Sequence, residues 1–151
     1  MKLINVLYMV ALATSMSYAQ TPEDMTAMQM ANRIINLINI NQSSEAILVY
    51  EATVETIRNS PDWGGIGEPP LGIAKATDAA IKYFIPKYPD AQYDVDAVML
   101  QRIPSINTIN RWFYKIDIRY AIRINGVVTP KSSSVIMLLD GNIIEPRISN
   151  E

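Results

Sequence analysis

The sequence contains no cysteine and no histidine among its 151 residues. Without them, neither a Ser-His-Asp triad nor a Cys-His pair can form, so the nucleophilic hydrolases built on these residues are excluded. Zinc, copper and haem sites, which depend mainly on histidine and cysteine ligands, are nearly excluded as well. Carboxylate sites for calcium or magnesium and acid–base pairs of carboxylates remain open. The fold must also be stable without disulfide bonds.

Positive charge is scarce too, with 13 lysine and arginine residues against 15 aspartate and glutamate residues. A weakly acidic chain lacks the electrostatic footprint of a nucleic-acid-binding protein. It also lacks the polybasic cluster that draws proteins to anionic membranes. We therefore expect no nucleic-acid partner and no electrostatic attachment to a membrane surface.

The only long apolar run lies at the N-terminus and has the layout of a secretory signal peptide. Lys2 supplies the positive charge, an apolar segment follows it, and Ser17 and Ala19 are the small residues that signal peptidase reads. The apolar run is shorter than the ~20 residues needed to span a bilayer. We therefore expect residues 1–19 to be removed on export, leaving a periplasmic or secreted chain that starts at Gln20 and has no transmembrane segment.

Hydrophobic periodicity divides the rest of the chain into two helices and four main strands. The first helix is predicted over residues 22–39, with a strand that begins near Ile34 as an open alternative, because this part is rich in isoleucine and asparagine. The other predicted elements are a strand over 46–58, a loop rich in proline and glycine over 59–70, a helix over 73–85, strands over 93–102, 111–125 and 135–139, and a short continuation at 143–144.

Residues 111–125 show the clearest alternation in the chain. Their even-numbered positions from Trp112 to Ile124 are all aromatic or aliphatic, and the odd-numbered positions carry the charges. This period of two indicates an antiparallel sheet with one buried and one solvated face. We therefore predict an α+β fold of cystatin-like architecture, in which one helix packs on a curved antiparallel sheet of about four strands, with an extra N-terminal helix. An N-terminal helix and linker would occupy residues 20–44, and the α+β domain residues 45–151.

Four segments between residues 71 and 144 resemble the PepSY domain, a small exported bacterial module. They are the alanine-rich helix segment 76–80, the Tyr-Pro-Asp-Ala turn at 88–91, the strand segment 111–117 and the Val-Ile-Met-Leu-Leu-Asp-Gly segment at 135–141. The strand over 111–125 and the loop before it are longer than the PepSY pattern. The resemblance implies a non-catalytic interaction module of a kind often linked to the regulation of secreted peptidases. It carries over no functional residues, because that family has no compact catalytic motif.

The two motifs with which true cystatins inhibit cysteine proteases are not in place. Gln101 is followed by Arg-Ile-Pro-Ser and so does not match the pattern Gln-x-Val-x-Gly. The segment most similar to the Pro-Trp hairpin, Pro-Asp-Trp at residues 61–63, precedes the helix and is on the wrong connection. We therefore do not expect inhibition of the cystatin type.

Two groups of residues are candidates for a partner-binding surface. Trp63 lies in the loop over 59–70, either as an exposed recognition residue or as an anchor that folds the loop onto the domain. A basic stripe on the outer face of the strand over 111–125 is either a binding surface or ordinary sheet surface paired with acids; its residues are Arg111, Lys115, Arg119 and Arg123. Tryptophan and arginine are enriched in binding hot spots, so the predicted surface joins Trp63 to this stripe.

The sequence therefore predicts an exported, non-catalytic binding or regulatory domain whose partner is an unidentified protein or peptide in the cell envelope. No catalytic, cofactor-binding or metal-ligating residue is assigned, and no cofactor is expected. A cone-shaped domain like nuclear transport factor, which binds a small ligand or catalyses a hydrolysis, is an open alternative that a deep pocket holding tyrosine or aspartate side chains would favour. A structural component of an envelope assembly is a third possibility, which large exposed apolar patches would support.

Overall fold

The computed structural model describes residues 27–41, 46–104 and 110–149 of the chain. Its elements are, in chain order, α1 (Ala27–Ala31), β1 (Ile34–Asn41), β2 (Ile47–Thr53), α2 (Val54–Asn59), α3 (Ile73–Phe84), β3 (Gln92–Arg102), β4 (Trp112–Ile124), β5 (Val127–Leu138), β6 (Ile143–Ile144) and β7 (Pro146–Ser149). The strands form a sheet of order β1-β2-β7 and a sheet of order β3-β4-β5-β6, and every pairing is antiparallel. The fold is therefore α+β, as predicted. The predicted signal peptide, residues 1–19, lies outside the described residues.

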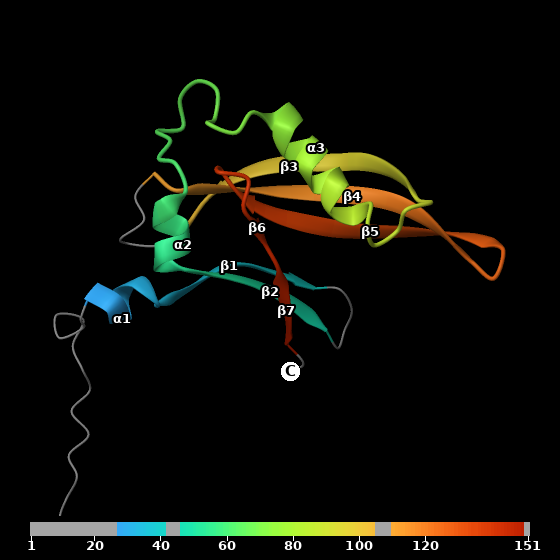
Figure 1. Ribbon diagram of the computed structural model, residues 1–151, viewed down its shortest axis with the longest axis horizontal. Helices are drawn as coiled ribbons and strands as arrows, with labels where there is room; N and C mark the ends of the chain where they lie inside the picture. Colours follow the sequence, from blue (N-terminus) through green and yellow to red (C-terminus); the bar gives the residue numbers. More distant parts are fainter. Residues whose placement is uncertain (1–26, 42–45, 105–109, 150–151) are drawn as a thin grey trace, which may run out of the picture.

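The four-stranded sheet carries α3 on one of its faces (Figure 1). The helix begins and ends within one residue of its predicted bounds, 73–85. Its small residues Ala76 and Ala80 have no exposed surface, which lets the helix approach the even-numbered residues of β4 closely. The core on this side contains Tyr114, Ile116 and Ile118, all fully buried. The alternation of the sequence therefore predicts this face of β4 correctly.

The opposite face of the same sheet is also covered, which the sequence did not predict. The sheet of β1, β2 and β7 lies beneath it, and α2 lies beside them (Figure 1). A second core forms here around Phe113, Ile136 and Leu138, which are at most 1% exposed. The expectation of one solvated face is therefore wrong for the first part of β4, because a second sheet buries the odd-numbered positions there.

The segment over residues 34–41 is a strand and not the end of a helix. The predicted helix over 22–39 is described only from Ala27, and α1 ends at Ala31. From Ile34 the chain forms β1, which pairs with β2. Branched isoleucine and short polar asparagine disfavour a helix interior, and burial of Ile35 and Leu37 against the second core stabilises the strand. The strand alternative is therefore confirmed, and this part of the expected N-terminal helix and linker, residues 20–44, is packed into the fold.

The predicted strand over 46–58 ends early, because Thr53 caps a short helix. The Thr53 hydroxyl accepts a hydrogen bond from the backbone N–H of Thr56 at 3.1 Å. Glu55 in the first turn and Arg58 in the last turn of α2 suit the helix dipole. The strand that remains, β2, lies in the three-stranded sheet and not in the sheet under α3.

The hairpin of β4 and β5 is longer than the sequence predicted. Asn125 and Gly126 both have positive φ, 50° and 82°, as a two-residue turn of type I′ requires. From this turn β5 pairs with β4 over its whole length, starting at Val127 and not at the predicted residue 135. Residues 129–134 include serines, a lysine and a proline, and for this reason the sequence did not predict this part of β5. Proline is tolerated there because β6 pairs only with Ile136 and Met137, so the earlier part of β5 is an edge.

Tyr50 connects the two sheets. Its hydroxyl donates a hydrogen bond to the backbone carbonyl of Ser134 on β5 at 3.1 Å. The pKa of Tyr50 is raised to about 12. Burial is the largest cause, and the nearby Tyr83, Glu145 and Asp117 raise the pKa further. The hydroxyl therefore stays protonated and able to donate at any ordinary pH. None of the helices in the described part of the chain has the length and apolar character to cross a membrane.

Candidate functional site

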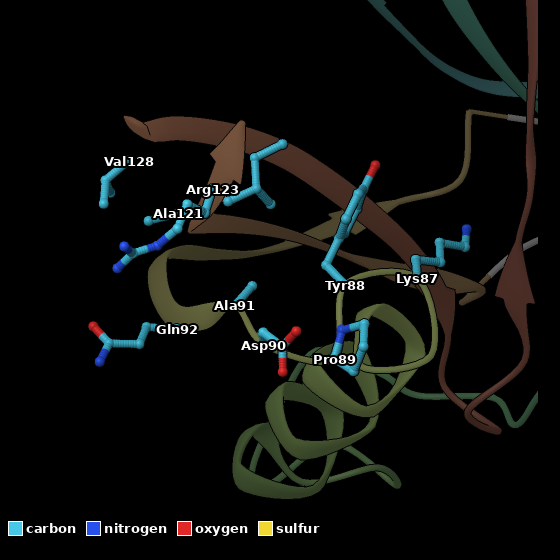
Figure 2. Close-up of a pocket in the computed structure, with 10 residues that line it drawn as sticks. Lys87, Tyr88, Pro89, Asp90, Ala91, Gln92, Ala121, Arg123 and Val128 are labelled. Atoms are coloured by element: carbon cyan, nitrogen blue, oxygen red, sulfur yellow. The ribbon is translucent and has the colours of Figure 1, made fainter. Parts of the chain in front are cut away.

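A hollow on the described surface lies where the β4–β5 hairpin projects beyond β3. It has a volume of about 640 Å³, and Figure 2 shows Arg123 and Gln92 extending to one side of it with Tyr88 at its other end. We call it the hairpin groove and define it by its lining residues, which are Lys87, Tyr88, Pro89, Asp90, Ala91, Gln92, Ala121, Ile122, Arg123 and Val128.

The groove exists because β3 is shorter than its neighbour at this end. The first residue of β3, Gln92, pairs with Ala121, so residues 122–124 of β4 have no strand beside them on that side within the described chain. Apolar side chains are exposed near the tip of the hairpin, where Val127 is 66% and Val128 58% exposed. An open strand edge beside exposed apolar side chains is a typical surface for binding a polypeptide.

The turn that forms the opposite wall is held in a fixed shape by hydrogen bonds. The Tyr93 hydroxyl donates to the carbonyls of Phe84 and Tyr88, at 3.0 Å and 2.5 Å. The backbone N–H of Ala91 donates to the same Tyr88 carbonyl at 3.1 Å. The Tyr88 ring stacks on Tyr120 of β4, with ring centroids 5.0 Å apart. The wall is therefore tied both to α3 and to the sheet.

Lys87 lies in a small polar network at the edge of the groove. Its ammonium group donates to the Tyr83 hydroxyl at 2.6 Å, and that hydroxyl donates to the Glu145 carboxylate. Burial alone would lower the pKa of Lys87, but the hydrogen bond to Tyr83 and the charge of Glu145 outweigh it and raise the pKa. Burial and the hydrogen bond to Glu145 raise the pKa of Tyr83 as well. Lys87 therefore remains charged at neutral pH.

Arg123 is the predicted site residue that lines this groove. It is exposed, and within the described residues it forms no salt bridge. Lys87 and Asp90 are the other charged residues of the lining. The groove therefore offers a free guanidinium group, which suits a carboxylate on a bound molecule.

Trp63 and Arg111 lie together at the other end of β4, where both hold the loop before α3. The Trp63 ring packs edge-on against Trp112, with centroids 5.2 Å apart, and the Trp112 indole N–H donates to the Trp63 carbonyl at 2.9 Å. Arg111 is 16% exposed; it pairs with Asp62 at 2.9 Å and donates to the Arg58 carbonyl at 3.0 Å. These contacts favour the interpretation of Trp63 as an anchor.

Lys115 and Arg119 are engaged with acids on the sheet. Lys115 pairs with Asp117, and the two side chains are only 15% and 26% exposed. The Ser134 hydroxyl on β5 also donates to Asp117. Arg119 pairs with both Asp94 and Asp96 of β3, each at 3.1 Å. The alternative of a sheet surface paired with acids therefore describes these two positions.

The surface predicted to join Trp63 with the basic stripe is not one continuous patch. Trp63 rests on Trp112, and Arg123 lies roughly 35 Å further along the strand at about 3.3 Å per residue. Trp112 packs on the α3 side of the sheet, whereas Arg123 occupies an alternate position of the strand and belongs to its other face. Arg123 therefore lies at the opposite end of β4 from Trp63 and Arg111, because the strand is long. It also lies on the opposite face of the sheet from Trp112, on which Trp63 packs.

We expect replacement of Trp63 with Ala to destabilise the protein by about 2 kcal/mol, less than the ~3–5 kcal/mol typical of a fully buried tryptophan, because the ring is half-buried. Urea unfolding followed by circular dichroism measures the change. Ile66→Ala is the matched control, since Ile66 lies in the same loop and is 89% exposed. Equal unfolding midpoints for the two variants would contradict the anchoring role of Trp63.

The sequence did not single out the groove residues other than Arg123. The sequence predicts a turn around Pro89 and Asp90, but not that this turn lines a groove. A usable signal was the difference in length between the predicted strands over 93–102 and 111–125, which implies that one strand projects beyond the other. Within the described residues no cluster of three or more carboxylates is placed to hold a metal ion.

Comparison of the chain with models of protein families, with curated proteins and with solved structures finds no match.

Proposed function

We propose that the chain is an exported, non-catalytic binding domain that holds an extended polypeptide segment of a cell-envelope partner in the hairpin groove. The signal-like N-terminus supports export, and the missing cysteine and histidine support a role outside catalysis. The PepSY resemblance makes a secreted peptidase the first partner to test.

The observation that carries the proposal is the open edge of β4 within the groove. Because β3 starts opposite Ala121, an extended segment can continue its line and pair with residues 122–124 of β4. Backbone hydrogen bonds to such an edge supply affinity, and side-chain contacts supply specificity. Tyr88 and Val128 offer apolar contacts, and Arg123 offers a partner for an acidic side chain. We therefore propose an extended peptide with at least one aspartate or glutamate as the ligand.

The arrangement of the strands around α3 supports the proposed likeness to PepSY or cystatin modules. One helix followed by β3, β4, β5 and β6 in sequence order, with the helix on one face of this sheet, is the arrangement expected of a PepSY-like or cystatin-like module. We propose that residues 73–144 are such a module, extended by a second sheet that PepSY and cystatin architectures do not require.

A cone-shaped domain that encloses a ligand is less well supported. Such a domain needs an interior pocket between helix and sheet. Here the space is filled by side chains with no exposed surface, Ala76 and Ala80 from the helix and Tyr114, Ile116 and Ile118 from β4. A filled interior favours binding at the surface.

Replacement of Arg123 with Ser is expected to weaken peptide binding by roughly 10- to 150-fold, because a hydrogen bond to a charged group contributes about 1.5–3 kcal/mol. The mature chain, residues 20–151, is panned against a displayed library of extended peptides, and the affinity of the recovered peptides is measured by fluorescence anisotropy. Recovered sequences should contain an acidic residue.

Arg119→Ser is the matched control, since it is the same substitution four residues away on the same strand and outside the groove lining. It should leave the affinity unchanged. If Arg123→Ser and Arg119→Ser bind equally well, or if no peptide is recovered, the hairpin groove is not a peptide site.

A further inference from the structure

The outer edge of β1 differs from the other strand edges of the molecule. Within the described residues β1 stands at the end of its sheet, paired only with β2. It is eight residues long and contains neither a charged residue nor a proline. Natural edge strands are usually protected against pairing with another chain by charges, prolines, bulges or short length.

The other edges show these protective features. The free edge of β5 contains Pro130 and Lys131, and the open edge of β4 is only three residues long, at 122–124. β3 carries Asp94, Asp96 and Arg102 as well as a bulge. β7 is four residues long and contains Pro146 and Arg147, and β6 is two residues long. β1 has a register shift between Asn36 and Ile38 but none of the charges. Of the edges described, β1 is thus the one open to pairing with another strand over most of its length.

The sequence of β1 is nearly the same in both directions. Read around a centre between Leu37 and Ile38, the segment Ile-Asn-Leu-Ile-Asn-Ile of residues 35–40 places isoleucine opposite isoleucine and asparagine opposite asparagine. Two antiparallel copies related by a twofold axis at this centre would pair Asn36 with Asn39 of the other copy, and Ile35 with Ile40. Isologous contacts of this kind require such self-complementarity.

The register shift makes this pairing consistent with the two faces of the sheet. In a regular strand, residues 36 and 39 would point to opposite faces of the sheet. Antiparallel pairing around this centre would then place an outer residue of one copy beside a core-facing residue of the other. The register shift between Asn36 and Ile38 changes which residues of β1 point to each face of the sheet. Ile34, Asn36, Asn39 and Asn41 are all exposed on one face, and the remaining residues lie toward the core. The outer residues of one copy would therefore meet the outer residues of the other.

The two asparagines already interact as a pair within one chain. The side-chain amide of Asn36 donates to the carbonyl oxygen of Asn39 at 2.9 Å. Each side chain retains further donor or acceptor capacity for a second asparagine across the twofold axis. On the other face, the partly buried Ile38 and Ile40 would lie beside Leu37 and Ile35 of the second copy.

We infer that the protein forms a homodimer in which the two β1 edges pair antiparallel, with Asn36 opposite Asn39, to make one continuous six-stranded sheet. A second copy of this chain is the occupant that the edge fits, because a charge-free, self-complementary strand needs no other partner to match it. The hairpin groove belongs to the other sheet and is separate from this interface.

The test compares two charge patterns at the same two positions. Asn36→Lys with Asn39→Lys brings lysine opposite lysine across the axis, whereas Asn36→Lys with Asn39→Asp brings lysine opposite aspartate. The mature chain and both variants are studied by sedimentation equilibrium, and thermal melts monitor folding of each. We expect the unaltered chain to dimerise and the Lys/Lys variant to dissociate at a concentration at least roughly tenfold higher than the Lys/Asp variant, since like charges directly opposite destabilise paired strands.

A monomeric unaltered chain at all accessible concentrations would overturn the inference. So would equal dissociation constants for folded Lys/Lys and Lys/Asp variants, because the dimer would then use another surface. Should the Lys/Lys variant fail to fold, the Lys/Asp variant decides alone. It should remain dimeric at low salt and weaken as salt screens the pair, and a dimer insensitive to salt would contradict the proposed register.

Discussion

The variant Ile118→Asp should be unfolded, and the variant of the next residue, Arg119→Ser, should remain folded. Ile118 has no exposed surface and lies in the core between α3 and the four-stranded sheet. An unpaired charge at such a site costs several kcal/mol, which is comparable to the ~5–15 kcal/mol total stability of a domain. The Arg119 side chain is 59% exposed, and its salt bridges to Asp94 and Asp96 are on the surface. Their loss should cost at most about 1 kcal/mol.

Thermal unfolding followed by circular dichroism separates these two outcomes. The Ile118→Asp variant should show no cooperative transition, while Arg119→Ser should melt within a few degrees of the unaltered protein. Similar melting curves for the two variants would mean that the assignment of faces along β4 is incorrect.

The elements that the sequence predicted well are those whose stability is decided locally. α3 has a stripe of small and aromatic residues followed by Pro86, and β4 alternates strictly on the side that packs against it. The Asn125-Gly126 turn is specified by two residues that tolerate positive φ. Each of these signals can be read from a short stretch of sequence, because a hydrophobic period, a proline after a helix and a turn pair are all local patterns.

The three-stranded sheet was missed because its strands come from distant parts of the chain. β7, at residues 146–149, pairs with β2, almost a hundred residues earlier. Its sequence Pro-Arg-Ile-Ser has no alternation that marks a strand. β1 likewise becomes a strand through its pairing with β2 and burial against the second core. Tertiary contacts of this kind override local propensity, so the local sequence left β1 open between helix and strand and did not indicate which strands pair with one another.

The candidate site was predicted only in part for a related reason. Residue types identified the charged side chains, but the fold decides whether each one is paired. The paired acid lies in the loop before α3 for Arg111, on β4 itself for Lys115 and on β3 for Arg119. Arg111 is bound by Asp62 and Arg119 by two aspartates of β3, so only Arg123 of the stripe is left without a salt bridge in the described structure. The groove itself results from the unequal lengths of β3 and β4, which depend on where each strand ends. Strand ends are the least certain part of a prediction from sequence.

Replacement of Phe113 with Ala tests the second core directly, and we expect it to destabilise the protein by about 3–5 kcal/mol. Strict alternation along β4 would place Phe113 on the solvated face with Arg111 and Lys115. The structure instead buries it, at 1% exposed, beneath the sheet of β1, β2 and β7. The cavity left by the phenyl ring would be lined by residues from separate elements, including Ile57 and Leu138, which cannot collapse together easily.

Urea unfolding of Phe113→Ala measures this cost, and Arg123→Ala provides the control. Both positions are odd-numbered residues of β4, so simple alternation treats them alike. In the structure Phe113 is covered and Arg123 is exposed, and substitutions at exposed sites usually change stability by less than about 0.5 kcal/mol. A large loss for Phe113→Ala with little change for Arg123→Ala requires that the sheet be covered at one end and free at the other. Small losses for both would mean that this face of the sheet is solvated throughout and that β1, β2 and β7 do not pack against it.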